Sequence, residues 1–173
     1  MDTVKILVFS DSHGKIDLMA DMVQKQTPDF IFHLGDYHED TEALHAQFPD
    51  IPLRAVRGNC DFRSETPDLE ELKIRDKTIL LTHGHRYHVK ESYDALQSMG
   101  QDAGADLLLF GHTHIPYYAR IDNMHVLNPG SALAVCALVE INETGEITCT
   151  HLPLVEPKET KETRGRIIVP PCS

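Results

Sequence analysis

The chain has 173 residues and a formal net charge of −11. A single domain of this size buries about 70% of the surface of its unfolded chain, enough for a sizeable core. The negative charge argues against a broad surface for extended nucleic acid, which would need a basic face. No apolar run approaches the ~20 residues of a membrane-spanning helix.

The four cysteines do not form the pattern of a disulfide framework or of a cysteine metal site. Cys60, Cys136, Cys149 and Cys172 include no C-x-x-C pair. The amino-terminal stretch MDTVKILVFSD enters a strand at once and lacks the pattern of a signal peptide. We therefore expect reduced cysteines and a cytoplasmic protein.

Strands and helices alternate in the first part of the sequence. Val4 to Ser10 is a nearly continuous apolar run, as in a strand buried on both faces. Met19, Met22 and Val23 recur at helical spacing before Thr27-Pro28. We expect strands at 4–10, 30–34 and 53–56 and helices at 16–26 and 40–48.

The second part is richer in strands. We expect a helix at 91–103, a strand at 106–110, and hairpins of 69–74 with 78–82, 117–121 with 125–128, and 132–142 with 146–152. These elements form one domain, residues 1–155, and 156–173 form a C-terminal extension. The polar stretch 156–166 is typical of a solvated tail. The apolar residues 167–169 could dock on a sheet edge or on a neighbouring subunit, which leaves a homo-oligomer open.

A polar cluster follows five of the apolar runs: D-S-H at 11–13, G-D at 35–36, G-N-C-D at 58–61, H-G-H at 83–85 and G-H-T-H at 111–114. Residues just beyond the carboxyl ends of strands line the ligand crevice of layered α/β proteins. Aspartate, asparagine and histidine supply oxygen and nitrogen donors that suit Mn, Fe, Zn or Ni. The donors exceed the needs of one ion, so the pattern indicates a hydrolytic site in which two ions share a carboxylate.

A structural reading of the histidines is the alternative. A histidine after a strand is more often a cap or a surface residue, and we expect such roles for several of the 11 histidines: His38, His45, His88, His125 and His151. Five clusters that all follow strand-like runs are hard to obtain by chance, so we favour the metal site.

The ordered set of motifs resembles the calcineurin-like metallophosphoesterase family. Length and motif spacing are similar to its small single-domain prokaryotic phosphodiesterase branch, and so is the N-P-G-S stretch at 128–131. The resemblance runs from about Val4 to about Glu140. It implies an α/β fold, a four-layer αββα sandwich of two facing mixed sheets flanked by helices.

The resemblance also implies a dinuclear metal centre. One ion would be held by Asp11, His13, Asp36 and His114, and the other by Asp36, Asn59, His83 and His112. Asp36 would bridge the two divalent ions, and a hydroxide between them would attack phosphorus in line. Oxygen and nitrogen ligands favour Mn²⁺, with Fe, Co, Ni or Zn able to take the same positions. The expected substrate is a small phosphoester or nucleotide.

Cys60 departs from the commonest family pattern, in which a histidine assists the leaving group or contacts the phosphoryl oxygen. A thiol with a pKa of about 8.5 is a poor substitute, so we expect activated diesters as substrates. Substrate contacts are expected from Asn59 and Cys60, and catalytic roles from Asn59, Asp61 and His85. Asp61 could orient Asn59 or another group near the site, and His85 could replace the missing histidine or support His83.

Three functions of different classes fit the sequence. The first is a two-metal phosphodiesterase or phosphatase. The second is a non-catalytic scaffold subunit on the same fold, and the third is a metal-binding sensor. Every predicted ligand position holds a competent ligand, which favours the enzyme.

Overall fold

A computed structural model describes residues 2–61 and 66–154 of the protein. Its elements in chain order are β1 (Val4–Phe9), α1 (Ile16–Gln26), β2 (Phe30–His33), α2 (His38–Gln47), β3 (Leu53–Ala55), β4 (Leu69–Ile74), β5 (Lys77–Thr82), the short 3₁₀ helix η1 (His85–Tyr87), α3 (Asp94–Asp102), β6 (Leu107–Leu109), β7 (Tyr117–Ile121), β8 (Met124–Asn128), β9 (Val135–Ile141) and β10 (Ile147–Pro153). The predicted C-terminal extension, with its docking segment 167–169, lies outside the described residues.

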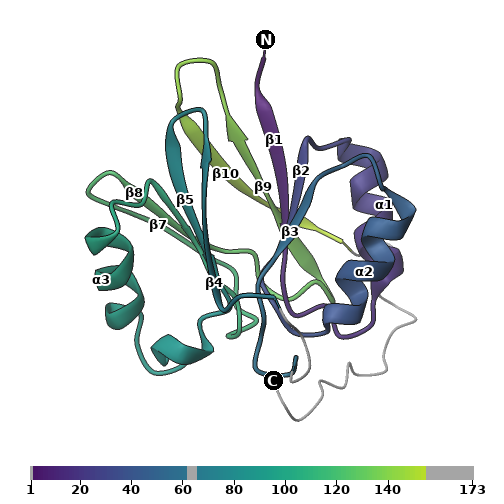
Figure 1. The fold of residues 1–173 in the computed structure, drawn as a ribbon, viewed down its shortest axis with the longest axis horizontal. Helices are drawn as coiled ribbons and strands as arrows, with labels where there is room; N and C mark the ends of the chain where they lie inside the picture. The colour runs from purple at the N-terminus through teal and green to yellow at the C-terminus, as the bar shows by residue number, and fades with distance from the viewer. Residues whose placement is uncertain (1, 62–65, 155–173) are drawn as a thin grey trace.

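The strands form two five-stranded mixed sheets (Figure 1). Sheet A has the order β10-β9-β1-β2-β3, and sheet B has the order β4-β5-β6-β8-β7. The parallel strands β1, β2 and β3 lie side by side in sheet A, as β5, β6 and β8 do in sheet B. Their carboxyl ends point to the lower end of the molecule in Figure 1.

The apolar core consists of three clusters. Successive side chains of a strand point to opposite faces of its sheet, so they enter different clusters. Ile6 and Val8 of β1 belong to the cluster shared by the two sheets, together with Ile79 and Leu81 of β5. Leu7 packs in the cluster under α1 and α2, and the third cluster lies between sheet B and α3. The layers are therefore helices, sheet A, sheet B and helix, which confirms the predicted αββα sandwich.

Most predicted elements agree with the observed ones to within two residues, but two begin later. The predicted helix 91–103 begins at Asp94, because His88 has a left-handed φ of 55° and accepts the backbone hydrogen bonds of Glu91 and Ser92 in a turn. The predicted strand 132–142 begins at Val135, because the N–H groups of Ala134 and Val135 both bond back to the carbonyl of Ser131.

The cysteines only partly follow the sequence prediction. Cys136 and Cys149 are free thiols, and burial raises the pKa of each to about 12. Cys60 is disulfide-bonded, so the prediction of a reduced thiol is wrong at this position. Spacing rules compare cysteines along the sequence and do not register those that the fold brings together.

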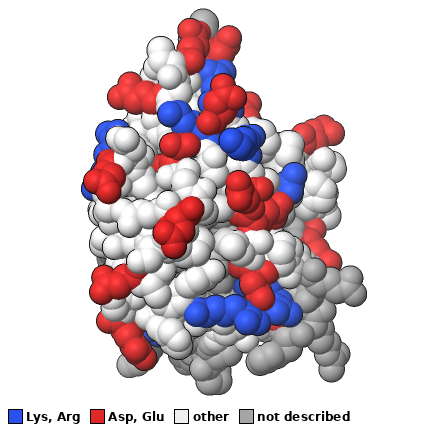
Figure 2. Space-filling model, turned by 60° about the vertical axis from the view of Figure 1, so that its left-hand side comes forward, with Lys and Arg blue, Asp and Glu red and all other residues white. Residues whose placement is uncertain are grey.

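Acidic and basic side chains are interspersed over the face of the molecule drawn in Figure 2. Within the described ranges, no helix combines the length and the apolar character that crossing a bilayer requires.

Candidate metal centre at the strand ends

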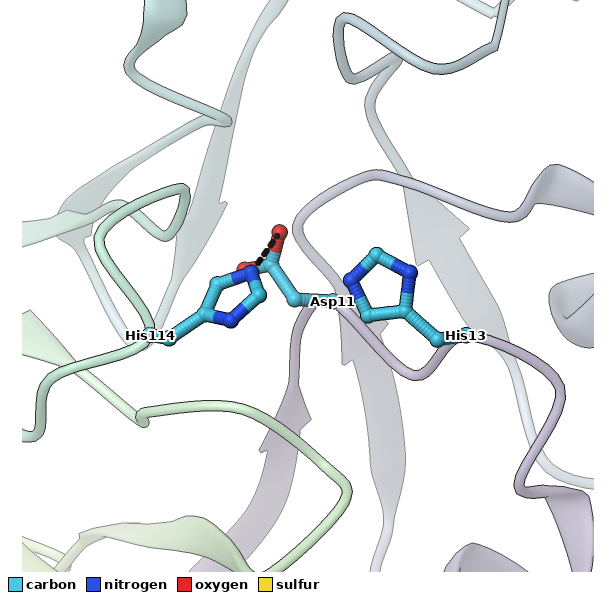
Figure 3. A group of neighbouring side chains, drawn as sticks. All are labelled: Asp11, His13 and His114. Atoms are coloured by element: carbon cyan, nitrogen blue, oxygen red, sulfur yellow. Dashed lines mark ion pairs between the residues drawn. The ribbon is translucent and has the colours of Figure 1, made fainter. Parts of the chain in front are cut away.

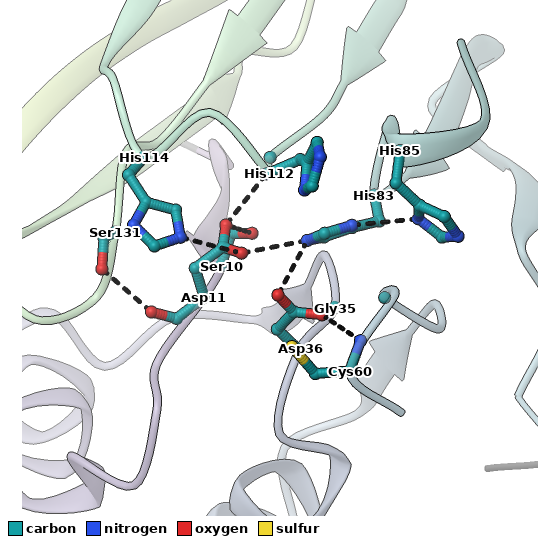
Figure 4. Close-up of polar contacts among 12 residues, drawn as sticks. Ser10, Asp11, Gly35, Asp36, Cys60, His83, His85, His112, His114 and Ser131 are labelled. Atoms are coloured by element: carbon teal, nitrogen blue, oxygen red, sulfur yellow. Dashed lines mark hydrogen bonds and ion pairs between the residues drawn. The ribbon is translucent and has the colours of Figure 1, made fainter. Parts of the chain in front are cut away.

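The predicted site residues meet at one edge of the sandwich. Asp11 and Asp36 follow β1 and β2 of sheet A, whereas His83 follows β5 and both His112 and His114 follow β6 of sheet B. Figure 4 shows these side chains converging from the loops at the strand ends. The two sheets therefore contribute to the same site.

Two groups of described residues could each hold an ion. Asp11, His13 and His114 form one group (Figure 3), and Asp11, Asp36 and His83 form the other. Within each group the ligand atoms all lie within 4.8 Å of one another. Asp11 belongs to both groups, although the sequence predicts Asp36 as the shared carboxylate.

Among the residues of these two groups, Asp11 makes several polar contacts. Its Oδ1 lies 2.9 Å from Nε2 of His83 and 3.4 Å from Nε2 of His114. Its Oδ2 accepts hydrogen bonds from Ser10 Oγ at 2.5 Å and from the backbone N–H of His112 at 3.0 Å. Burial opposes ionisation, but the charge of His83 and these hydrogen bonds outweigh it and hold the pKa of Asp11 well below its ordinary value. Asp11 is therefore an anion in the folded protein.

Asp36 lies on the other side of His83. Its Oδ1 accepts a hydrogen bond from the backbone N–H of Cys60 at 2.9 Å, and its Oδ2 lies 3.5 Å from Nε2 of His83. Burial raises the pKa of Asp36 to about 6; the charge of His83 opposes this shift and that of Asp11 adds to it. Burial opposes a charge on His83, but Asp11 and then Asp36 outweigh it and raise the pKa of His83. Positive charge between the two carboxylates, from His83 or from a metal ion, favours their joint ionisation.

Several buried ligand atoms have no hydrogen-bond partner among the described residues: both ring nitrogens of His13, Nδ1 of His112 and Oδ2 of Asp36. Burial lowers the pKa of His13 and lowers that of His112 to about 4, so both rings are neutral. Buried polar atoms nearly always have partners, and a neutral imidazole offers a lone pair to a metal. The residues therefore fit divalent ions.

The backbone of the site is strained. Five of the predicted ligands have left-handed φ angles: Asp11 at 53°, His13 at 47°, Asp36 at 70°, His112 at 73° and His114 at 66°. Only a few per cent of non-glycine residues have positive φ. Such strain gathers at functional sites, where the surrounding structure holds it in place.

The side chain of Asp61 links the G-D loop to the G-N-C-D loop by hydrogen bonds. Its Oδ2 accepts backbone hydrogen bonds from Asp36 and Gly58, both at 2.9 Å, and its Oδ1 accepts one from His38 at 2.8 Å. Asp61 thus ties the G-D loop to the G-N-C-D loop. Gly58 is required at this crossing, because a Cβ there would collide with the carboxylate and backbone of Asp36.

His85 contacts the candidate ligand His83 directly. The Nδ1 atoms of the two rings lie 3.1 Å apart, so one of them donates to the other. Burial, followed by the nearby charge of His83, lowers the pKa of His85 to about 4. This position fits a residue that supports His83. Asn59 and Cys60 lie in the loop between Gly58 and Asp61.

The last residue of β8 and the loop after it support two of the motifs. The side-chain amide of Asn128 donates to the carbonyl of Gly111 at 3.1 Å and to Thr113 Oγ1 at 3.0 Å. Ser131 Oγ donates to the carbonyl of Asp11 at 2.9 Å. The N-P-G-S stretch, which the sequence marked only by resemblance, therefore fixes the D-S-H and G-H-T-H loops.

Four buried polar residues in or beside these loops have no role predicted from the sequence: Ser10, Ser12, His33 and Asp40. The sequence pattern could have singled out Ser10 and His33, because each is a polar residue at the end of a mostly apolar strand. The histidines expected to have ordinary roles lie outside both ligand groups. Among them, His38 pairs with Glu42 at 3.3 Å, and His125 contacts the Tyr118 hydroxyl at 2.7 Å.

Comparisons with known proteins give consistent results. A family model described as the calcineurin-like phosphoesterase superfamily domain matches residues 4–144. The "probable metallophosphoesterase YsnB" of Bacillus subtilis is 31% identical over 130 residues, which cover 74% of this chain and 75% of that protein. Phosphodiesterase YfcE of Escherichia coli K12 is 24% identical over 152 residues, covering 74% and 79%.

Solved structures match the same architecture. A predicted phosphoesterase of Streptococcus pneumoniae TIGR4 has a TM-score of 0.70 at 25% identity, covering 88% of this chain and 99% of that one. The protein Vps29 of Entamoeba histolytica, complexed with zinc, has a TM-score of 0.69 at 21% identity, covering 88% and 100%.

Proposed function

Because the chain belongs to the calcineurin-like phosphoesterase superfamily, we propose that it is a metal-dependent phosphodiesterase that hydrolyses a small phosphoester or nucleotide. The observation that carries the proposal is the set of buried ligand atoms of His13, His112 and Asp36 that have no hydrogen-bond partner among the described residues. A relative at 24% identity is a phosphodiesterase. The cytoplasmic location stays a prediction.

The proposed centre holds two ions, and Mn²⁺ is the ion that we favour. Asp11, His13, Asp36 and His114 would hold one ion, and Asp36, Asn59, His83 and His112 the other. When bound, such ions lower the pKa of a water and neutralise phosphoryl oxygens. Carboxylate, amide and imidazole ligands without thiolate favour Mn²⁺ over softer ions.

The protein's own groups would prepare this centre. Asp11 is ionised before any ion arrives, because His83, His114 and Ser10 stabilise its charge. The neutral rings of His13 and His112 present lone pairs without first losing a proton. Asp61 and Ser131 fix the loop backbones, so little reorganisation is needed when substrate binds. Asn59 and His85 would then orient the phosphoryl group and His83.

The direct test is turnover of bis(p-nitrophenyl) phosphate, an activated diester, by metal-stripped protein to which single divalent ions are returned. We expect no turnover in excess chelator, and recovery with Mn²⁺ at least equal to that with Mg²⁺. Full turnover in the presence of the chelator would overturn the proposal.

The shared carboxylate can be identified by counting bound ions. Asp36 is proposed as the bridge, whereas Asp11 belongs to both ligand groups of the structure. We expect Asp36→Asn to weaken both ions and to lower turnover more than any other ligand substitution. Loss of both ions in Asp11→Asn, with only one lost in Asp36→Asn, would assign the bridge to Asp11.

Position 60 is proposed to limit the enzyme to good leaving groups. Cys60→His restores the imidazole of the commoner family pattern, so we expect it to raise turnover of alkyl esters more than that of activated aryl esters. Cys60→Ser is the matched control, because it removes the disulfide without adding an imidazole. Equal effects of the two substitutions on both substrate classes would remove any leaving-group role from this position.

A scaffold function is the second candidate, favoured by the TM-score of 0.69 with Vps29, a vacuolar protein sorting protein. A scaffold needs Asn59 and His83 only for packing, whereas an enzyme needs them for its second ion. We expect Asn59→Ala and His83→Ala to fold and keep one ion, and to lose turnover by a factor on the order of 10². Wild-type protein with both ions bound and no turnover of any phosphoester would favour the scaffold.

A further inference from the structure

A continuous buried hydrogen-bond network runs beneath the D-S-H loop. The backbone N–H of Gly35 donates to His33 Nδ1 at 3.2 Å, and His33 Nε2 lies 3.0 Å from Ser12 Oγ. Ser12 Oγ donates to Asp40 Oδ2 at 2.5 Å, and the backbone N–H of Gly14 donates to the same oxygen at 2.7 Å. The three side chains are at most 4% exposed.

With Asp40 ionised, counting donors and acceptors assigns a direction to every bond in this network. Since Ser12 gives its only proton to Asp40, its oxygen must accept from His33, which then carries its proton on Nε2. That tautomer leaves Nδ1 free to accept from Gly35. One neutral histidine tautomer therefore satisfies each member, and satisfied buried networks specify a single arrangement.

The network reaches both sides of the candidate ligand His13 through Ser12 and Gly14, and it reaches Gly35, the residue before Asp36, through His33. Ser12 and Gly14 flank it, and the segment is strained, with φ angles of 47° at His13 and 87° at Gly14. The ring nitrogens of His13 make no hydrogen bond to any described residue. The ring packs edge-on against Tyr37 with centroids 4.7 Å apart, and the hydrogen bonds of Ser12 and Gly14 fix the backbone on either side. Asp11, by contrast, is held by its own bonds to Ser10, His83 and His112.

We propose that Ser12, His33 and Asp40 are positioning residues that set the affinity of the ion held by His13 more strongly than that of the ion held by His83. The proposal rests on the proposed metal-dependent function. None of the three residues belongs to either ligand group. They act through the backbone of the D-S-H loop: α2, which carries Asp40, and β2, which carries His33, hold that backbone in the left-handed conformation. Residues that support metal ligands in this way typically change metal affinity by about 10- to 100-fold when removed.

The test measures Mn²⁺ binding by calorimetry and counts bound ions by electron paramagnetic resonance, independently of turnover. We expect Asp40→Ala to weaken one of the two ions by about 10-fold or more and to leave the other within about twofold of wild type. Asp40→Asn should rescue the affinity, because its amide oxygen can still accept from Ser12 and Gly14.

Thr41→Ala is the matched control. Thr41 is the buried neighbour of Asp40 on α2, but its hydroxyl donates to the carbonyl of His38 at 2.6 Å, away from the D-S-H loop. We expect it to lower thermal stability without changing either affinity. Equal losses of affinity in Asp40→Ala and Thr41→Ala would mean that the network affects metal binding only through the overall stability of the protein. That result would overturn the proposal.

Two further outcomes are decisive. If Asp40→Ala does not fold, Ser12→Ala removes the central hydroxyl and keeps the carboxylate; wild-type affinities in that variant would overturn the proposal. Wild-type protein that binds no Mn²⁺, Fe²⁺, Co²⁺, Ni²⁺ or Zn²⁺ would overturn the proposed function itself. Normal metal binding in both network variants would overturn only this inference.

Discussion

At the scale of single residues, left-handed backbone is concentrated at the site, because five of the eleven described non-glycine residues with positive φ are predicted ligands. His13 is a useful case, because its φ is 47° and the residue as a whole is only partly buried. A left-handed conformation costs an L-residue about 1–2 kcal/mol, and glycine avoids most of this cost.

This strain predicts that His13→Gly is more stable than His13→Ala. We expect a difference of roughly 0.5–1 kcal/mol in the free energy of unfolding of metal-free protein, measured by urea denaturation. The matched pair at Glu42, an exposed residue within α2, should show the reverse order by about 1 kcal/mol. Glycine less stable than alanine at both positions would contradict the proposed strain.

The sequence predicts that Asp11, Asp36 and His83 gather at the strand ends, but it does not predict the residues that support them. Asp11, Asp36 and His83 each follow an apolar run, and this local pattern predicts a strand end. Asp40 and Ser12 are 28 positions apart and meet only in the folded protein. No local pattern in the sequence reports such a contact.

At the scale of elements, helix α1 shows how far local signals reach. Its predicted and observed bounds coincide, because Met19, Met22 and Val23 repeat at helical spacing and Thr27-Pro28 ends the helix. Helix α2 was harder to place at its start. Its buried face carries Asp40 and Thr41 as well as Leu44, so its apolar repeat is weak.

The end of α1 offers a stabilising substitution. Thr27 closes the helix with a left-handed φ of 45°, and its N–H bonds to the carbonyl of Val23. This conformation suits glycine and disfavours a β-branched residue. We expect Thr27→Gly to stabilise the protein by about 1 kcal/mol, and so to raise the melting temperature by roughly 2–4 °C.

Thr27→Ala is the control for that substitution. Alanine keeps the Cβ that the left-handed conformation disfavours, so its melting temperature should stay near that of wild type. A glycine variant no more stable than the alanine variant would mean that Thr27 is not strained in the folded protein.

At the scale of the whole molecule, buried neutral histidines make folding sensitive to acid. Burial lowers the pKa of His33 to about 4, against 6.5 for an ordinary histidine. Between these values the unfolded chain binds a proton that the folded chain does not, so stability falls as the pH falls through this window. The contribution of His33 is complete above pH 6.5 and amounts to up to about 3 kcal/mol.

Comparing wild type with His33→Gln isolates this contribution. Other titrating groups, such as Asp36 with a pKa of about 6, affect both proteins alike. We expect the stability advantage of metal-free wild type over the variant to shrink as the pH falls from 7 to 5, measured by urea unfolding. Parallel stability curves for the two proteins would show that His33 does not titrate in this way.

The pairing of the two ends of the described domain was beyond the reach of the sequence. The sequence predicts β1 and β9 as strands, but not that Val4 pairs with Ile141 and Val8 with Ala137. Pairing over such distances depends on the packing of the whole sheet rather than on any local preference. For the same reason, the distribution of the ligands over both sheets became visible only in the structure.

Because β9 pairs with β1 in sheet A, the site cannot be assembled until β9 has been synthesised. Asp11 receives its bond from Ser131, and its strand β1 is flanked on one side by β9. A ribosome releases the chain from its amino terminus at ~5–20 residues per second, so Asp11 emerges several seconds before Ser131 and β9 do. During that interval the nascent chain contains Asp11 but neither Ser131, which bonds to it, nor β9, which pairs with its strand. Under the proposed metal-dependent function, tight ion binding would therefore begin only after translation has passed β9, and metal loading would follow completion of the fold.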